Sequence, residues 1–337
     1  MKKMLLALAA GLFFSSMYAQ NDFNVILAAG VEDAERFADD YMAPGTNGLM
    51  YSMNNGWFNS AEVKPFLGFE VSVIANGALV SDDKKSFALN EANYENVRFA
   101  QGPSVQNVAT ALGENVPDID VVLTYDDPIF GGQEVEITLP NGLGDAASLI
   151  PSAVIQAGVG VIKATELKFR FIPKITYDEV STELYGFGLQ HEFTEWLPAD
   201  KLWPVAISGL VGYTRLNGSY NFTESSGIEG ENQRVENNTS TWAFQMIGST
   251  RLPVINFYGS LGYLTGTSES DILGTYIVTD GLLTTEEITD PFSVDSEVSG
   301  VRATLGTRLK LGVFRFNADY TFAEYDTFSV GLHLGFR

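Results

Sequence analysis

Hydrophobic and polar residues alternate along many stretches of this chain, with the two-residue period of a β-strand. The clearest case is residues 327–337, TFSVGLHLGFR, where large apolar side chains fall on one face and small or polar ones on the other. This pattern is typical of a strand with lipid on one side and a wet interior on the other. A soluble protein ending in such a strand would leave its edge exposed, so we expect the strand to close a barrel.

The same alternation recurs along most of the chain. The predicted strands cover residues 65–77, 152–162, 166–177, 182–192, 204–216, 239–251, 253–265, 298–310, 313–323 and 327–337. Each is close to the roughly 9–11 residues that a tilted membrane strand needs. Short connections alternate with longer ones, as in outer-membrane barrels, whose short turns face the periplasm. We therefore predict an all-β, up-and-down antiparallel transmembrane β-barrel of 10–12 strands, within a range of 8–14, with a short N-terminal helix or plug.

Three segments divide the chain. Residues 1–19 have the basic start, short apolar core and small-residue end of a cleavable signal peptide. Residues 20–64 are predicted to form a helix, over residues 25–41 and ended by Pro44 and Gly45, followed by a plug-like segment. Residues 65–337 form the predicted barrel, with a long external insertion at residues 78–150 that is expected to contain an extra hairpin or two.

Composition and charge narrow the range of expected partners and exclude some kinds of chemistry. The net charge of −22 makes nucleic acid an improbable partner. The absence of cysteine excludes disulfides, thiolate metal sites and a cysteine nucleophile. Export leaves the soluble periplasm or the outer membrane as destinations. The large aromatics on the outward faces and the alternation of short and long connections favour the outer membrane of a Gram-negative bacterium. The expected partners are outer-membrane lipid and lipopolysaccharide, and the barrel-assembly machinery, which would engage the C-terminal strand through its penultimate residue, Phe336. Trp57, Phe58, Trp196, Trp203 and Trp242 are expected in the aromatic girdle at the membrane interfaces.

Charged residues on the minority face of the strands are the candidate site. Charges inside a barrel are costly unless they meet water or partners. They could form a salt-bridged lumen that anchors the plug, with the acidic helix as the complement of the basic residues, or a selectivity ring for anionic or amphipathic solutes. The candidate lumen-lining residues are Glu70, Lys168, Arg170, Arg302, Arg308, Lys310, Arg315, Asp319 and His333.

Catalysis, dinucleotide binding and metal binding have little support in the sequence. His333 and Ser329 share a face, but nucleophilic catalysis needs a third, orienting group, so no enzyme activity is predicted. Gly158, Gly160, Gly186 and Gly188 echo part of a dinucleotide fingerprint but lie within strands, where close packing explains them better. The loop acids lack the spacing of a calcium loop, although divalent bridging to anionic lipid stays open. No cofactor or metal site is predicted.

Residues 48–73, with NNGWFNSAEVKPFLGFEVSV at their centre, resemble a family of uncharacterised Gram-negative outer-membrane barrel proteins. Residues 139–144, LPNGLG, and residues 156–173 share this resemblance, which covers most of the mature chain. The family carries no established activity. In layout the chain is more distantly similar to the outer-membrane transporters of fatty acids and hydrocarbons, in which an N-terminal segment plugs the lumen and a hydrophobic ligand crosses the wall.

This layout suggests passive uptake of a small hydrophobic or amphipathic solute as the leading functional hypothesis. The alternative is a non-conducting surface barrel, binding or structural, that acts through its acidic external loops.

Overall fold

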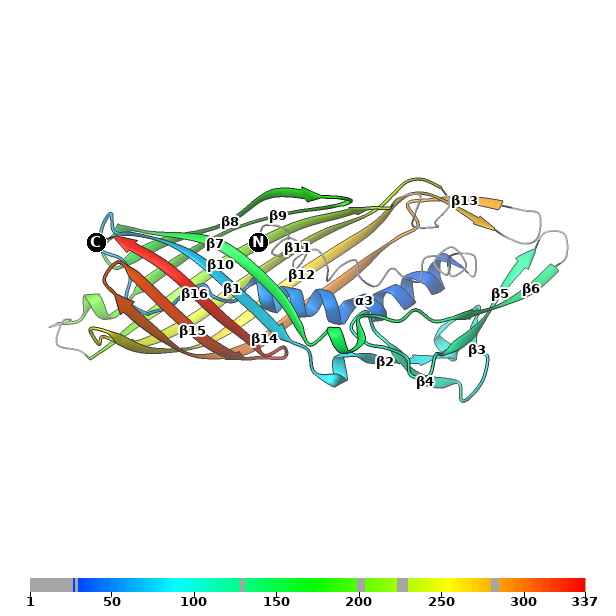
Figure 1. Cartoon of the computed structure of the whole chain (residues 1–337), viewed down its shortest axis with the longest axis horizontal. Coiled ribbons are helices and arrows are strands. Elements are labelled where there is room, and N and C mark those ends of the chain that lie inside the picture. Colours follow the sequence, from blue (N-terminus) through cyan, green and yellow to red (C-terminus); the bar gives the residue numbers. More distant parts are fainter. Residues whose placement is uncertain are drawn as a thin grey trace.

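The computed structural model describes residue 27 and residues 30–127, 131–198, 204–222, 230–279 and 285–336. The predicted signal peptide, Trp203 and Arg337 lie outside the described residues. Within the described part, strands form a long barrel, the helix α3 runs along its axis, and a smaller lobe lies beyond one end (Figure 1).

A closed antiparallel ring forms the barrel wall. Its members are β1 (Phe69–Leu79), β7 (Leu149–Ile162), β8 (Thr165–Tyr177), β9 (Val180–Glu192), β10 (Val205–Asn221), β11 (Gly230–Thr250), β12 (Ile255–Thr279), β14 (Phe292–Leu311), β15 (Phe314–Phe322) and β16 (Thr327–Phe336). The last strand pairs with the first, and pairing of β11 with β12 completes the circuit. The prediction of an up-and-down transmembrane barrel is confirmed, and the wall of the described chain is made by ten strands, without members from the insertion.

The two ends of the barrel differ. At the turn end, strands are joined by short connections such as residues 163–164 and 312–313, and the C-terminal strand finishes there. At the loop end, β11, β12 and β14 extend far beyond β15 and β16, so one side of the wall is tall and the other low (Figure 1). Among the described residues, the short strand β13 (Thr285–Thr289) pairs only with the far end of β12.

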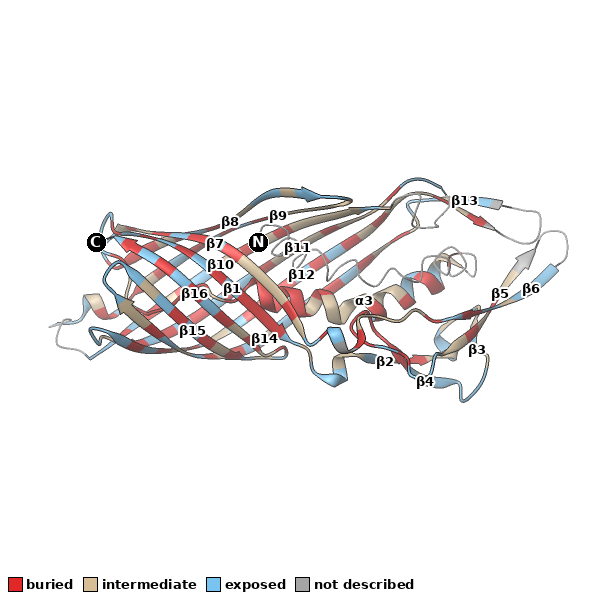
Figure 2. Cartoon of the chain, in the orientation of Figure 1, coloured by how far each residue is buried: buried red, intermediate tan, exposed pale blue. Residues whose placement is uncertain are grey.

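The outward face carries a band of exposed apolar side chains, whereas inward-facing residues are buried. Buried and exposed residues accordingly alternate along the wall strands (Figure 2). Four aromatic residues on neighbouring strands lie at the same height, seven or eight residues above the turn end of their strands. This outer aromatic row consists of Tyr185, Tyr213, Trp242 and Tyr263. Immediately beyond it the outward residues become polar, as in Arg215 and Ser240. Eight to ten residues of a strand tilted by about 40° span roughly 20–25 Å, the height of a membrane-facing band.

The helix α3 (Val31–Met53) starts at the loop end and enters the lumen. The prediction that it would end at Pro44 was wrong, because the helix continues through Pro44 and Gly45 for more than two further turns. A proline within a helix costs about 3 kcal/mol. Burial of Leu49, Met50 and Tyr51 against the wall offsets that cost. No helix in the described ranges is both long and apolar enough to cross a bilayer.

Residues 80–148 form the outer lobe, which lies beyond the low side of the wall (Figure 1). Its elements are η1 (Asp82–Lys84), β2 (Ser86–Asn90), η2 (Glu91–Asn93), β3 (Val97–Phe99), β4 (Val105–Ala109), β5 (Asp120–Asp127), β6 (Gly131–Thr138) and η3 (Gly144–Ala146). They make one two-stranded and one three-stranded sheet. Phe37 and Tyr41 of α3 pack into the core of the lobe, so the first half of the helix is held outside the membrane band.

Candidate functional site

Residues 54–64 connect α3 to β1 and lie inside the ring; we call them the plug segment. They touch every strand of the wall. Their contacts are with Ile74 and Glu70 on β1, Gln156 on β7, Arg170 and Glu166 on β8, Gly188 and Gln190 on β9, Gly212 on β10, Ser249 on β11, Tyr258 on β12, Arg302 and Arg308 on β14, Thr321 on β15, and Ser329 and His333 on β16. A chain that meets all ten strands occupies the centre of the lumen.

Trp57 is the largest buried anchor of the plug segment, with 1% of its surface exposed. Its ring fills a notch between Gly188 and Gly212, where an added Cβ would lie 3.0 and 2.7 Å from ring atoms. On its other side, the guanidinium of Arg170 stacks 3.7 Å from the ring centre. The indole nitrogen donates to Asn54 Oδ1 at 2.7 Å. Gly188, for which the sequence indicated close packing, and Gly212 therefore make room for this one side chain.

Arg170 also holds the backbone of the plug segment. Its terminal nitrogens donate to the carbonyl oxygens of Met53 at 3.0 Å and Asn55 at 2.7 Å, and its Nε donates to Gln156 at 2.9 Å. No carboxylate forms an ion pair with Arg170 among the described residues. The arginine thus uses its fork of donors to satisfy carbonyls that the end of α3 leaves unpaired.

Arg302 repeats this role from the opposite wall. It donates to the Asn54 carbonyl at 3.4 Å and to the Asn55 side chain, which also accepts a hydrogen bond from Thr321 at 3.3 Å. Two arginines on β8 and β14 therefore bracket the turn that follows α3.

An ionic cluster surrounds Glu70 nearer the turn end. Glu70 pairs with Lys64 at 3.4 Å and with Arg315, and it accepts a hydrogen bond from Asn59 at 3.1 Å. His333 lies 3.7 Å from the same carboxylate and within hydrogen-bond distance of Ser72. Glu70 and Asn59 are both buried. Their contacts with Arg315 on β15 and His333 on β16 connect the junction of the plug segment and β1 to the last two strands.

A second ionic cluster lies beside it. Lys168 pairs with Glu166 at 3.2 Å, and Glu166 accepts the backbone N–H of Lys64 at 3.0 Å. These side chains are all buried, so each charge is compensated locally rather than by water.

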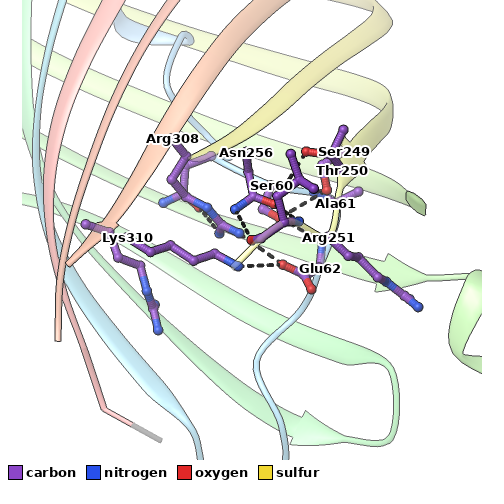
Figure 3. Close-up of polar contacts among 12 residues, drawn as sticks. Ser60, Ala61, Glu62, Ser249, Thr250, Arg251, Asn256, Arg308 and Lys310 are labelled. Atoms are coloured by element: carbon purple, nitrogen blue, oxygen red, sulfur yellow. Dashed lines mark hydrogen bonds and ion pairs between the residues drawn. The ribbon is translucent and has the colours of Figure 1, made fainter. Parts of the chain in front are cut away.

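Glu62 forms the third ionic contact, shown in Figure 3. Its carboxylate accepts hydrogen bonds from Arg308 at 3.0 Å and Lys310 at 3.1 Å. Burial alone would raise the pKa of Glu62, but the positive charges of Lys310 and Arg308 outweigh burial and lower it below its ordinary value of 4.5. On the opposite side, the Ser249 hydroxyl oxygen accepts a hydrogen bond from the backbone N–H of Ala61 at 3.0 Å.

The structure thus places all nine candidate residues on the inner side of the ring, and six of them contact the plug segment directly. Asp319 was expected in a salt-bridged lumen, but it accepts hydrogen bonds from Tyr258 at 2.7 Å and Asn317 at 3.0 Å and forms no ion pair among the described residues. The acidic first half of α3 was also expected to complement the lumen cations. It contacts the outer lobe instead, because the helix enters the lumen only with its second half.

One further expectation is corrected. Trp57 and Phe58 are not girdle residues, because both are buried in the lumen, whereas Trp196 and Trp242 are exposed on the wall or its rim. His333 and Ser329 share the inner face but have separate partners: Ser329 donates to Asn76 at 2.6 Å. No group of residues that could hold a metal ion occurs among the described residues.

Several anchoring residues were missed in the sequence. Glu166 and Gln190 share the inward period of Lys168 and Arg170, and that alternation was a sufficient signal to find them. Glu62 and Lys64 lie in an irregular segment, where no period shows which way a side chain points. Together these residues hold a polypeptide segment inside a barrel.

A closed antiparallel ring, an outward apolar band and an internal plug define a transmembrane β-barrel with the fold of outer-membrane proteins. Within that class, the chain belongs to a family of unknown function, DUF6588, whose model matches residues 1–336. This agrees with the family indicated by residues 48–73. No curated protein matches the chain.

Solved barrels are only distantly similar. Ail, the attachment invasion locus protein of Yersinia pestis, is 9% identical, with 80% of this chain and 97% of that chain covered and a TM-score of 0.26. The translocator domain of autotransporter NalP from Neisseria meningitidis is 11% identical, covering 98% and 99%, with a TM-score of 0.28. The outer membrane protease OmpT from Escherichia coli is 7% identical, covering 82% and 100%, with a TM-score of 0.27. At these scores the likenesses carry no argument about what this chain does.

Proposed function

We propose that this protein is a plugged, non-conducting barrel of the Gram-negative outer membrane that anchors a binding lobe at the cell surface. The observation that carries the proposal is the contact of the plug segment with all ten strands of the wall. Moving that segment would break buried hydrogen bonds and leave buried charges unpaired, which costs about 3–5 kcal/mol for each broken buried pair. This favours a permanent seal over an open channel.

The outer lobe supports the second half of the proposal. Short turns of outer-membrane barrels face the periplasm, which puts the loop end and the lobe outside the cell. The lobe has a groove of about 450 Å³ between β4 and the loop before β5. Glu114, Asp118 and Asp120 line it, together with neutral amides. Its volume falls in the range of small-ligand sites, and its charge favours a cationic ligand.

Conductance tests the seal. In planar bilayers the full chain is expected to give no steady current, and a variant with both Arg170→Ala and Arg302→Ala is expected to give transient openings. A steady current from the unmodified protein would overturn the proposal. It would instead support passive uptake, the other hypothesis, which requires a displaced plug segment. Faster entry of a fluorescent single-chain amphiphile into cells that make the protein would likewise support passive uptake.

Binding of a hexalysine peptide tests the lobe. The variant with Glu114→Gln, Asp118→Asn and Asp120→Asn is expected to bind the peptide at least tenfold more weakly than the parent protein. A matched control with Glu136→Gln, Glu269→Gln and Glu297→Gln removes the same charge outside the groove and should retain most of the binding. Equal losses in both variants would mean that only the overall charge matters, and the groove would not be a site.

A further inference from the structure

A second groove lies on the barrel wall, away from the lobe and the plug segment. It has a volume of about 200 Å³ and is formed at the loop end of β8, β9, β10 and β11. Its lining is almost entirely polar and includes Lys174, Ser181, Glu183, Asn217 and Ser219. We call it the wall groove. Such a volume is below the roughly 300 Å³ of drug-sized pockets and suits a sugar ring or a phosphate group.

The height of the wall groove is set by the outer aromatic row. Tyr185 on β9 is followed on the same outward face by Glu183 and Ser181, and Tyr213 on β10 is followed by Asn217 and Ser219 with Arg215 between. The wall groove therefore begins within two to four residues of the row, or roughly 5–10 Å along the barrel axis. Aromatic girdles mark the boundary between hydrocarbon and headgroups. The groove thus lies where the headgroups and sugars of outer-leaflet lipids lie.

The sides of the wall groove are held in place by their own hydrogen bonds. Ser181 and Ser219 bond through their hydroxyls at 2.9 Å, and Asn217 donates to Glu183 at 2.8 Å. Side chains fixed in this way lose little further entropy when a ligand arrives. Hydroxyl, amide and carboxylate groups on neighbouring strands are suitable partners for sugar hydroxyls.

Two cations at the wall groove can contact a ligand: Lys174 lines the groove, and Arg215 lies beside it. Lys174 is exposed and has no ion-pair or hydrogen-bond partner among the described residues. Arg215 lies between the aromatic row and the groove, and its Nε donates to Asn217 at 3.2 Å. Its terminal nitrogens have no partner in the described part of the chain. On a protein with a net charge of −22, two cations beside a polar groove at headgroup height point to a local anionic partner.

We infer that the wall groove binds the phosphorylated sugar headgroup of a glycolipid of the outer leaflet, with its acyl chains against the apolar band below. Lys174 and Arg215 contact the phosphate, and the amides and hydroxyls of the groove contact the sugar. This inference rests on the height and lining of the groove and on the proposed orientation, with the loop end outside the cell. It does not depend on whether the plug segment seals the lumen or the lobe binds a ligand.

The test measures binding of purified lipopolysaccharide to the full protein in nanodiscs. A variant with both Lys174→Ala and Arg215→Ala is expected to bind about 25-fold more weakly, since each cation near an anionic surface is worth about fivefold. Ser219→Trp, which fills the groove without changing charge, is expected to lose binding as well. The control removes two cations elsewhere, with Lys163→Ala and Arg98→Ala, and should bind as the parent does.

Heat-modified mobility on gels first establishes that each variant has folded. Unchanged binding by either folded groove variant would overturn the inference. Inorganic phosphate is the second probe: it is expected not to displace lipopolysaccharide at millimolar concentration. Full displacement would mean that the groove takes a soluble anion, and the assignment to a lipid headgroup would be wrong.

Discussion

Replacing Arg170 with alanine is expected to free the plug segment while leaving the barrel closed. Arg170 is 1% exposed and makes three hydrogen bonds besides its stacking on Trp57. Hydrogen bonds from a charged donor contribute about 1.5–3 kcal/mol each, and a desolvated cation–π contact about 2 kcal/mol. Their sum of roughly 6–11 kcal/mol is an upper limit, because removing the guanidinium also removes its desolvation cost of several kcal/mol. We expect a net loss of about 3 kcal/mol in docking of the plug segment.

The chain contains no cysteine, so a single introduced thiol reports this docking cleanly. Ser52 is fully buried and next to the carbonyl that Arg170 holds, and Ser52→Cys changes its volume little. A loss of about 3 kcal/mol raises the maleimide labelling rate of Cys at position 52 by roughly 100-fold when labelling is limited by the open population. Arg170→Lys should label nearly as fast, because an ammonium cannot reproduce the bidentate contact or the stacking.

The control is Arg98→Ala, which removes an exposed arginine that pairs with Glu134 in the outer lobe. It should leave labelling at position 52 unchanged, since exposed ion pairs contribute about 0–1 kcal/mol. If Arg170→Ala labels within threefold of the parent, the guanidinium does not hold the plug segment, and the reasoning from its contacts fails.

Three other outcomes are expected. Gly212→Val should displace Trp57 from its notch, because even a Cβ would lie 2.7 Å from the ring, and tryptophan fluorescence should shift to longer wavelength. The ion pairs of Glu62 should stabilise docking fully above pH 4.5 and be lost as the pH falls through its lowered pKa, so hydrogen exchange of residues 58–64 should accelerate only under more acidic conditions. Phe37→Ala should cost about 3–5 kcal/mol of packing between α3 and the outer lobe, and proteolysis of the lobe should accelerate while the barrel stays intact.

Each outcome has its own contrary result. An unshifted tryptophan fluorescence spectrum for Gly212→Val would mean that the notch can hold both Trp57 and the valine side chain. Because Glu62→Gln removes the titrating group, persistence of the acid-induced exchange in that variant would assign it to another residue. Loss of the folded barrel in Phe37→Ala would mean that the lobe and the wall do not separate energetically.

The sequence alone determined the wall. A two-residue period predicts which side chains of a strand face lipid, whatever fills the lumen, because lipid contacts each strand separately. It therefore indicated β16 and its topology correctly, and it identified Arg170 and Arg302 as inward-facing charges. The same local rule could not say what those charges meet.

Only the tertiary structure decided how the lumen is filled. Pro44 and Gly45 locally favour the end of a helix, yet α3 continues to Met53 because the surrounding ring buries its second half. Glu62 and Lys64 have no periodic pattern, and their partners are distant in the chain. The plug segment takes its conformation from ten strands that close around it, and this is a property of the ring that no local stretch of sequence contains.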